Sequence, residues 1–358
     1  MTAEIVDTSI TGITGRIRRR VDELLSDFLD ARRPPVGDHD VAEGYRLLRE
    51  FVIEGGKRVR PLLCYWGWRG AGGEELREAA VVATGAALEL YHAGLLIHDD
   101  LMDGSELRRG RPTIHRGLAR PGRFGAAEAF GQSAAILLGV LAQAWAEELL
   151  ADAAPADVRA RAARDLFNRM RTEVVTGQYL DLLAHARGDD GVEQALTVIR
   201  YKTARYTVER PLQIGAALAG APPSLLEAYS RFGLPLGEAF QLRDDVLGVF
   251  GDPSVTGKPV LDDLREGKRT VLMAYASARA RGPERDLLRT WHGDPALDEA
   301  RAAELRRIIV DTGALDRVEE LIVQRTGQAL AALRDCPITP EAAEALAVLT
   351  ERLTRRVR

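Results

Sequence analysis

The chain has 358 residues, 46% of them hydrophobic, and a formal net charge of −4. A net negative charge argues against general nucleic-acid binding. The two cysteines, Cys64 and Cys336, lie far apart without metal-site spacing, which indicates a reducing cytoplasm. The first residues lack the basic and apolar segments of a secretory signal. We therefore expect a cytoplasmic protein that does not bind nucleic acid.

The composition predicts an all-α fold. The chain is rich in Ala, Leu, Arg and Glu, which favour helix, and alternating β-branched runs are scarce. No repeat or low-complexity linker divides the chain, so we expect one helical domain over residues 1–358. In chain order, helices are expected over residues 11–33, 41–53, 74–102, 125–151, 157–186, 191–218, 224–250 and 270–281, and near 298–336 and 340–357. Pro211 should kink or interrupt its helix.

The longest apolar stretch, Ala79–Ile97, approaches transmembrane length. Glu89 and His92 interrupt it, and three aspartates follow it. A helix that is apolar nearly all round is also typical of the centre of a bundle. We therefore expect a central core helix and no transmembrane segment.

Three aspartates at the end of this stretch are the first candidate site. Asp99 and Asp103 share a helix face one turn apart, with Asp100 close by. Like charges at this spacing repel, so a cation should lie between them. Oxygen ligands alone suit Mg²⁺, which is usually held by one or two carboxylates together with substrate phosphates. Arg108 and Arg109 follow and can grip those phosphates; the alternative is a solvated acidic helix end followed by a basic loop.

A second cationic segment lies upstream, at Gly55–Pro61. Two glycines free the backbone for a tight turn, and Lys57, Arg58 and Arg60 follow within four residues. The segment is interpreted as a diphosphate clamp or, alternatively, as a basic loop between helices.

A second acidic pair, Asp244 and Asp245, lies roughly 140 residues beyond the first, again near the end of a predicted helix. Gln241 precedes the pair by one turn, and Lys258 and Lys268 follow it. If the two acidic helices face each other, their carboxylates line one cavity from both sides, as in metal-binding helical bundles. Such a cavity, with a basic rim and an apolar tunnel, suits a substrate with a diphosphate head and a hydrocarbon tail.

Several motifs together resemble those of the trans-prenyl diphosphate synthases, also called polyprenyl synthetases. They are GGKRVRP, IHDDLMDGSELRRGRPTIHR, GQYLD, YKTARYTVERP, FQLRDDVLGVFGDP, TGKP and DLREGKRT, in this order between about residues 50 and 275. The resemblance implies an all-α bundle of the isoprenoid synthase type with a central active-site cavity, and a homodimer. It implies head-to-tail condensation of isopentenyl diphosphate with an allylic diphosphate.

The resemblance also assigns roles to residues of this chain. The metal ligands, expected to hold about three Mg²⁺ ions with substrate bound, are Asp99, Asp100, Asp103, Asp244 and Asp245. The residues that bind the diphosphates of the two substrates are Lys57, Arg58, Arg60, His92, Arg108, Arg109, Gln178 and Lys268. The catalytic residues, which hold the leaving diphosphate or lie beside the developing carbocation, are Lys202, Thr203, Gln241 and Lys258.

Two positions depart from the family pattern. The second aspartate motif often reads DDxxD, but its fifth position here is Gly248. The third metal ion is then expected to rest on Asp244, with help from Asp245 or a water. The helix after the first motif often carries Gly-Asp where this chain has Gly139-Val140.

Product length should depend on the helix upstream of Asp99. The positions expected to face the tail are Leu95, Gly94 and Tyr91. Gly94 is expected to leave its level open, and Tyr91 lies three residues deeper, roughly 4.5 Å along the helix. A floor at Tyr91 predicts geranylgeranyl diphosphate; alternatively, Tyr91 is a packed core aromatic.

Other functions remain open at this stage. A class I terpene cyclase also ionises an allylic diphosphate, but it needs no second diphosphate site such as GGKRVRP. A farnesyl or longer-chain synthase and a subunit of a heteromeric synthase are further alternatives.

Overall fold

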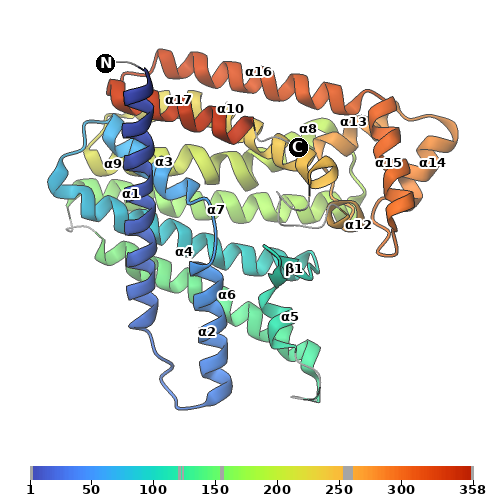
Figure 1. Ribbon diagram of the computed structural model, residues 1–358, viewed down its shortest axis with the longest axis horizontal. Coiled ribbons are helices and arrows are strands. Elements are labelled where there is room, and N and C mark those ends of the chain that lie inside the picture. Colours follow the sequence, from blue (N-terminus) through green and yellow to red (C-terminus); the bar gives the residue numbers. More distant parts are fainter. Residues whose placement is uncertain (1–2, 120–121, 123–124, 154–156, 253–260, 356–358) are drawn as a thin grey trace. The chain divides into compact units, whose positions relative to one another are not determined.

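The computed structural model describes residues 3–119, 122, 125–153, 157–252 and 261–355. It is built almost entirely of helices (Figure 1), which confirms the all-α prediction. Two compact units can be distinguished: residues 1–164 with 214–221, and residues 165–213 with 222–358. The expectation of a single domain stays a prediction.

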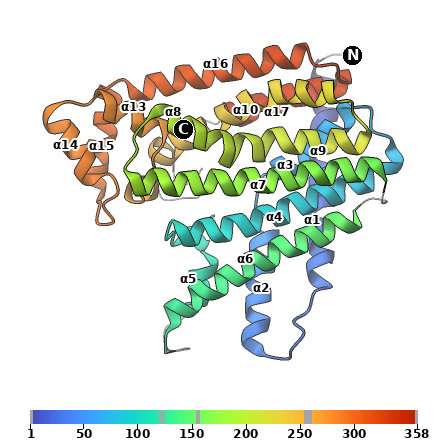
Figure 2. The same ribbon diagram turned by 180° about the vertical axis from the view of Figure 1, so that it is seen from behind.

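The first unit is organised around one buried helix. Its elements are α1 (Ala3–Asp30), α2 (His39–Ile53), α3 (Val59–Gly70), η1 (Glu75–Arg77), α4 (Glu78–Met102), β1 (Leu107–Arg108), β2 (Arg111–Pro112), α5 (Ile114–Leu118), α6 (Ala127–Asp152), the start of α7 (Val158–Arg187) and the end of α9 (Arg210–Ala219). Helix α4 packs most extensively against α6 and also contacts α3 and α1; Figures 1 and 2 show α4 and α6 running together. It is therefore the core helix that its apolar sequence predicts.

Glycines set how closely the helices of this unit approach. A Cβ built on Gly94 of α4 would lie 2.7 Å from the carbonyl oxygen of Gly139 on α6. A Cβ on Gly215 of α9 would lie 1.9 Å from the carbonyl oxygen of Cys64 on α3. Neither site has room for a side chain, so each glycine is required by backbone-to-backbone packing.

Two helices, Glu75–Met102 and Ala127–Asp152, are long and apolar enough to cross a membrane, by length and composition alone. In the first, 83% of the most apolar window is buried inside the protein, as expected of a core helix. In α6 the corresponding share is 39%. Helix α6 therefore leaves much of an apolar surface uncovered within the described chain.

The second unit is centred on α10 (Pro223–Phe250). The remaining elements are most of α7, α8 (Val192–Val198), η2 (Ile199–Glu209), the start of α9, α12 (Asp262–Arg265), α13 (Val271–Arg279), α14 (Gly282–Trp291), α15 (Glu299–Asp311), α16 (Ala314–Arg334) and α17 (Pro340–Thr354). Helix α10 packs against both η2 and α16. Its Arg243 donates two 2.7 Å hydrogen bonds to Glu319 of α16 and one of 3.0 Å to the carbonyl of Thr354. This arginine therefore ties α10 to α16 and α17.

The structure differs from the predicted elements in several places, including the additional helices α12 and α14 and the division of the stretch near 298–336 into α15 and α16. The helix expected over 191–218 is divided into α8, the π-helix η2 and α9, and Pro211 is the second residue of α9. Helix α3 is not predicted, because it is buried on nearly every side and has no polar face to reveal a period. The loop expected after α4 contains the hairpin β1–β2, in which Arg108 pairs with Arg111.

Candidate active site

A buried ion pair lies at the carboxyl end of α4. Asp100 is 1% exposed and accepts hydrogen bonds of 2.6 and 2.8 Å from Nε of Arg108, with Nη2 at 2.5 Å. Burial alone would lower the pKa of Arg108, but the bonds to Asp100 outweigh it and raise the pKa. Both oxygens of Asp100 are thus bonded to Arg108, and its role as a metal ligand stays a prediction.

Asp99 and Asp103 are the other two metal candidates of this helix end. Asp99 is 21% exposed, and its carboxylate lies 3.7 Å from Nη2 of Arg108. Asp103 follows the last turn of α4, where its backbone N–H donates to the carbonyl of Asp99. The negative end of the helix dipole adds to the repulsion between these carboxylates. A cation at this position would relieve it.

Arg58 of the predicted clamp has a structural role. It is 5% exposed, and its guanidinium donates to Asp22, to Glu89 and to the carbonyls of Val52 and Ile53 at the end of α2. Its backbone is left-handed, with φ of 50°, a conformation that costs a side-chain-bearing residue about 1–2 kcal/mol. These contacts hold the Arg58 guanidinium inside the protein, and its role in binding substrate stays a prediction.

Four arginines of the first unit act electrostatically on His92. Burial is the main cause that lowers the pKa of His92 well below its usual value, and the charges of Arg60, Arg109, Arg108 and Arg58 lower it further. His92 is therefore a neutral imidazole amid several arginines. The structure thus brings together residues that the sequence places on three separate segments, while Lys57 is exposed on the Gly55–Gly56 loop.

Arg109 lies at the tip of the β1–β2 hairpin. Arg109 and Gly110 both have positive φ, at 55° and 75°, as a two-residue type I′ turn requires. The guanidinium folds back over Gly55, where a Cβ would lie 2.2 Å from Nη1. Gly55 is therefore needed to bring the hairpin arginine against the basic loop.

Glu89 belongs to this cluster, although the sequence analysis does not assign it a role. It is 4% exposed, pairs with Arg58 at 3.2 Å, and its Oε1 has no hydrogen-bond partner among the described residues. A Cβ on Gly56 would lie 3.5 Å from its Oε2 and from Nη2 of Arg109. A lone acid three residues before His92, within an otherwise apolar stretch, was the signal available in the sequence.

The residues expected to set product length lie on different faces of α4. Tyr91 is 2% exposed, and Leu95, four residues on, shares its helix face. Gly94 instead faces α6, where a Cβ would lie 2.7 Å from the Gly139 carbonyl and 2.8 Å from Cγ of Gln143. The expectation that Gly94 leaves an open level is therefore wrong, because α6 fills that space. Gly139 is itself required, since a Cβ there would overlap the ring of His98.

In the second unit, the π-helix η2 presents Lys202 and Thr203. π-Helices are rare, usually span a single turn and often occur at functional sites, whereas η2 spans 11 residues. Glycines on both neighbours make room for the wider helix. A Cβ on Gly177 of α7 would lie 2.3 Å from the amide nitrogen of Lys202, and one on Gly237 of α10 would lie 2.4 Å from Cα of Ala204.

A chain of hydrogen bonds links η2 to the second acidic pair. Thr203 donates to Oε1 of Gln241 at 2.7 Å, and the Gln241 amide donates to Asp245 at 2.8 Å. Lys202 pairs with Asp181 of α7 at 2.7 Å, and Gln178 lies one turn before Asp181 on that helix. The sequence-predicted residues of this unit therefore form connected contacts.

Asp245 is the most perturbed acid of the site. Burial raises its pKa to about 8; the hydrogen bond from Gln241 opposes this shift, the charges of Asp263 and Asp244 add to it, and Lys268 opposes it. Asp244 is less buried than Asp245. Lys268 donates to Asp263 at 2.8 Å and lies 2.9 Å from Glu266. Lys258 lies outside the described residues.

The donor set fits magnesium. The candidate ligands are all carboxylate oxygens, which hard cations prefer. Within the described parts of the chain, no three acidic, histidine or cysteine side chains gather closely enough to hold a metal by themselves. Magnesium at these aspartates would therefore need oxygens from a bound diphosphate, which is its usual coordination.

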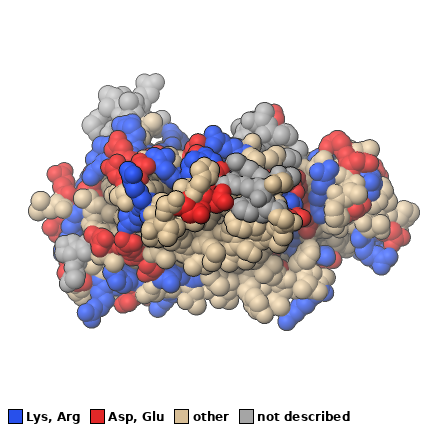
Figure 3. All heavy atoms as spheres, turned by 90° about the horizontal axis from the view of Figure 1, so that it is seen from below, with Lys and Arg blue, Asp and Glu red and all other residues tan. Residues whose placement is uncertain are grey.

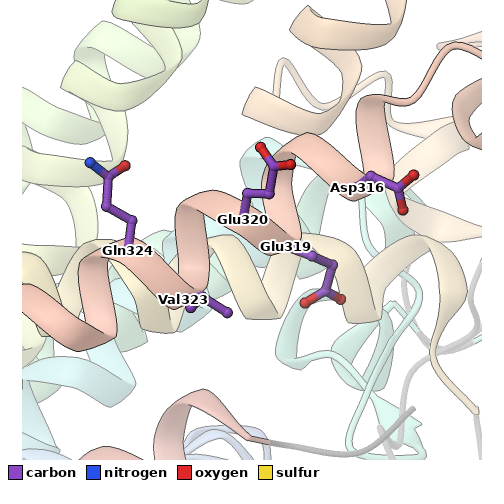
Figure 4. A pocket seen from close by; sticks show the side chains of 5 residues that line it. All are labelled: Asp316, Glu319, Glu320, Val323 and Gln324. Atoms are coloured by element: carbon purple, nitrogen blue, oxygen red, sulfur yellow. The ribbon is translucent and has the colours of Figure 1, made fainter.

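A separate hollow of about 510 Å³ lies along α16 (Figure 4). Asp316, Glu319, Glu320, Val323 and Gln324 line it. Its three carboxylates would repel a diphosphate, and Glu319 is already paired with Arg243. The hollow contains none of the predicted site residues, so it is not a candidate for the active site.

Comparison with known proteins gives consistent matches. The family model described as "Polyprenyl synthetase" matches residues 42–309. A geranylfarnesyl diphosphate synthase of Aeropyrum pernix is 36% identical, over 86% of this chain and 92% of that protein. A geranylgeranyl diphosphate synthase of Methanosarcina mazei is 32% identical, over 88% and 90%. The crystal structure of geranylgeranyl pyrophosphate synthase from Corynebacterium glutamicum, complexed with isoprenyl diphosphate and magnesium, is 41% identical with a TM-score of 0.91, over 96% and 99%.

The raised pKa of Asp245 predicts a pH-dependent stability of the metal-free protein. An aspartate in the unfolded chain loses its proton near pH 4, whereas folded Asp245 keeps it to about pH 8. Between these values the folded state binds more protons, so the free energy of unfolding falls as pH rises through this window. Urea unfolding in the presence of a chelator, from pH 5 to 8.5, measures this slope.

Asp245→Asn should flatten that slope, because the amide does not titrate. Asp252→Asn, which changes an exposed aspartate just beyond α10, is the control and should keep it. Equal slopes in the wild type and Asp245→Asn would contradict the assignment.

Proposed function

This chain belongs to the polyprenyl synthetase family and is a trans-prenyl diphosphate synthase of the isoprenoid synthase fold, and we propose that its main product is geranylgeranyl diphosphate. It condenses isopentenyl diphosphate with an allylic diphosphate, for which dimethylallyl, geranyl and farnesyl diphosphates are the candidates. The family assignment removes the terpene cyclase alternative. The arginine cluster around neutral His92, beside the aspartates of α4, supports the condensation of two diphosphates. The product length rests on the buried Tyr91 of α4.

The basic residues of the first unit divide into two sets, one for each diphosphate. Lys57, Arg60, His92 and Arg109 bind isopentenyl diphosphate, and neutral His92 can donate one hydrogen bond without adding charge. Arg108, fixed by Asp100, points its charge at the allylic diphosphate beside Asp99 and Asp103. Magnesium, about three ions per site, supplies charge stabilisation for the departing diphosphate. Lys202 and Lys258 hold the leaving diphosphate from the protein side, and Lys268 and Gln178 bind substrate.

The hydrogen-bond chain on η2 suits the positive half of the reaction. Because Thr203 donates its proton to Gln241, the lone pairs of its oxygen remain available to face a developing allylic cation. Gln241 is held by Asp245 at its amide end, which fixes the direction of its carbonyl dipole. Fixed dipoles of this kind stabilise charge without reorganising during the reaction.

The reaction is tested by incubating the purified chain with isopentenyl diphosphate and each allylic primer. We expect geranylgeranyl diphosphate in mass analysis of the products, and no product when magnesium is chelated. Activity that appears only with a second protein would favour a subunit of a heteromeric synthase, and a shorter or longer main product would overturn the assignment of product length.

Tyr91 is proposed as the floor for the growing chain. Tyr91 lies on α4, its side chain is buried, and it shares a helix face with Leu95. Pocket shape governs how an enzyme discriminates between substrates or products of different length. Tyr91→Ala should lengthen the product by at least one isoprene unit, as measured by mass analysis. Tyr91→Phe keeps the ring and is the matched control, with product length unchanged. Unaltered length in Tyr91→Ala would leave Tyr91 as a core aromatic only.

We propose that the chain works as a cytoplasmic homodimer joined through α6. An 18-residue window of this helix has low charge, and only 39% of it is buried. Its exposed apolar residues are Phe130, Ile136, Leu137 and Val140. Figure 3 shows that uncharged side chains cover a broad area of one face of the molecule. A second copy of the chain packed on α6 would remove this surface from water. The apolar Val140 fits such a buried interface better than a charged residue at this position would.

Leu137→Arg should convert the dimer into monomers. Leu137 is 69% exposed, and a buried charge at an apolar interface is strongly unfavourable. Light scattering after size-exclusion chromatography measures the mass against 39.1 kDa for one chain. Leu76→Arg, at another exposed leucine, is the control and should stay dimeric. A monomeric wild type, or one that sediments with lipid vesicles, would contradict a dimer through this surface.

A further inference from the structure

The glycine at the fifth position of the second aspartate motif has a carboxylate lying against it. Gly248 is on α10, one turn beyond Asp244. A Cβ built on Gly248 would lie 1.7 Å from Oδ2 and 2.8 Å from Cγ of Asp263. The carboxylate of Asp263 therefore occupies the space in which a side chain at position 248 would begin.

The position of Asp263 is fixed by its neighbours. Its Oδ1 accepts a 2.8 Å hydrogen bond from Nζ of Lys268, while Oδ2 lies against Gly248. The connection between α14 and α15 holds the same segment, since the amide of Gly293 donates to the carbonyl of Leu264. Arg265 also donates to the carbonyl of Leu297. Short helix α12 is thus held firmly beside α10.

Asp263 acts electrostatically on the same group of acids. Its charge, together with that of Asp244, adds to the effect of burial in raising the pKa of Asp245. Asp263 is 18% exposed on its side chain, and Lys268 is the cation paired with it. A further carboxylate beside a buried acid is unfavourable unless a cation compensates it.

We infer that Asp263 supplies, from α12, the third carboxylate that the second aspartate motif lacks at Gly248, and that it acts on the magnesium bound with diphosphate. This inference rests on the proposed function. In the position it occupies here, the Asp263 carboxylate fills the space in which a side chain at position 248 would begin. Glycine at 248 leaves this space to Asp263, and the departure from DDxxD is compensated rather than lost.

The geometry permits an exchange of the two positions. A Cβ on residue 248 would lie 3.6 Å from Cβ of Asp263, an ordinary contact. The double variant Gly248→Asp/Asp263→Ala therefore moves the carboxylate from α12 to α10 without a clash. Gly248→Asp alone should be destabilised, because its new side chain meets the Asp263 carboxylate.

The test measures magnesium binding by calorimetry in the presence of inorganic diphosphate, which requires no turnover. Asp263→Ala should weaken magnesium binding by about 10- to 100-fold, as loss of a supporting carboxylate usually does. The double variant should recover most of that loss. Asp262→Ala, which removes the adjacent acid of the same helix, is the matched control and should bind as the wild type does. Urea unfolding of each metal-free variant separates binding from folding.

Two results would overturn the inference. One is wild-type magnesium affinity in Asp263→Ala; the other is a folded double variant that binds no better than Asp263→Ala. Failure of the proposed function is seen separately, because it concerns the products formed by the wild type and not the order of magnesium affinities among the variants.

Discussion

The ion pair between Asp100 and Arg108 is the interaction on which the first unit's site depends. An almost fully buried carboxylate at the negative end of α4 is tolerable only with a cation fixed against it. Removing one partner of such a pair typically costs about 3–5 kcal/mol. The pair also anchors strand β1, and with it the turn that directs Arg109 over Gly55. One buried contact thus sets the position of both the acidic and the basic side of the site.

In the second unit, a neutral side chain, Gln241, links the site residues to one another. Gln241 accepts from Thr203 and donates to Asp245, so its orientation is fixed from both ends. The widened helix η2 is accommodated because Gly177 and Gly237 bring two neighbouring backbones close to it. Polar placement here depends on glycines as much as on the polar residues themselves.

The sequence predicted the class of fold, because periodic apolar faces are local signals, and its charged motifs indicated the candidate site residues. It did not reveal which of these candidates are engaged in buried contacts within the protein. Asp100 and Arg58 match the motifs as well as their neighbours do, and only the three-dimensional contacts show that they turn inward.

Gly94 shows that helix packing, too, could not be predicted from the local sequence. Its meaning depends on α6, more than 30 residues away in sequence, and no local pattern reveals that a glycine faces another backbone. The π-helix was also not predicted, because its wider turns are accommodated by the close approach of α7 and α10 at Gly177 and Gly237, which lie outside η2 in the sequence. The neighbour of Gly248 in the second aspartate motif was likewise hidden, since Asp263 of α12 lies against it only in the folded chain.

The neutral imidazole at His92 has a consequence for the living cell. A histidine with an ordinary pKa would gain charge as the surrounding fluid acidifies, and an anion held beside it would then bind more tightly. Here burial, together with the nearby arginines, lowers the pKa of His92 well below its usual value. Mild acidification should therefore leave the charge of the empty basic cluster unchanged.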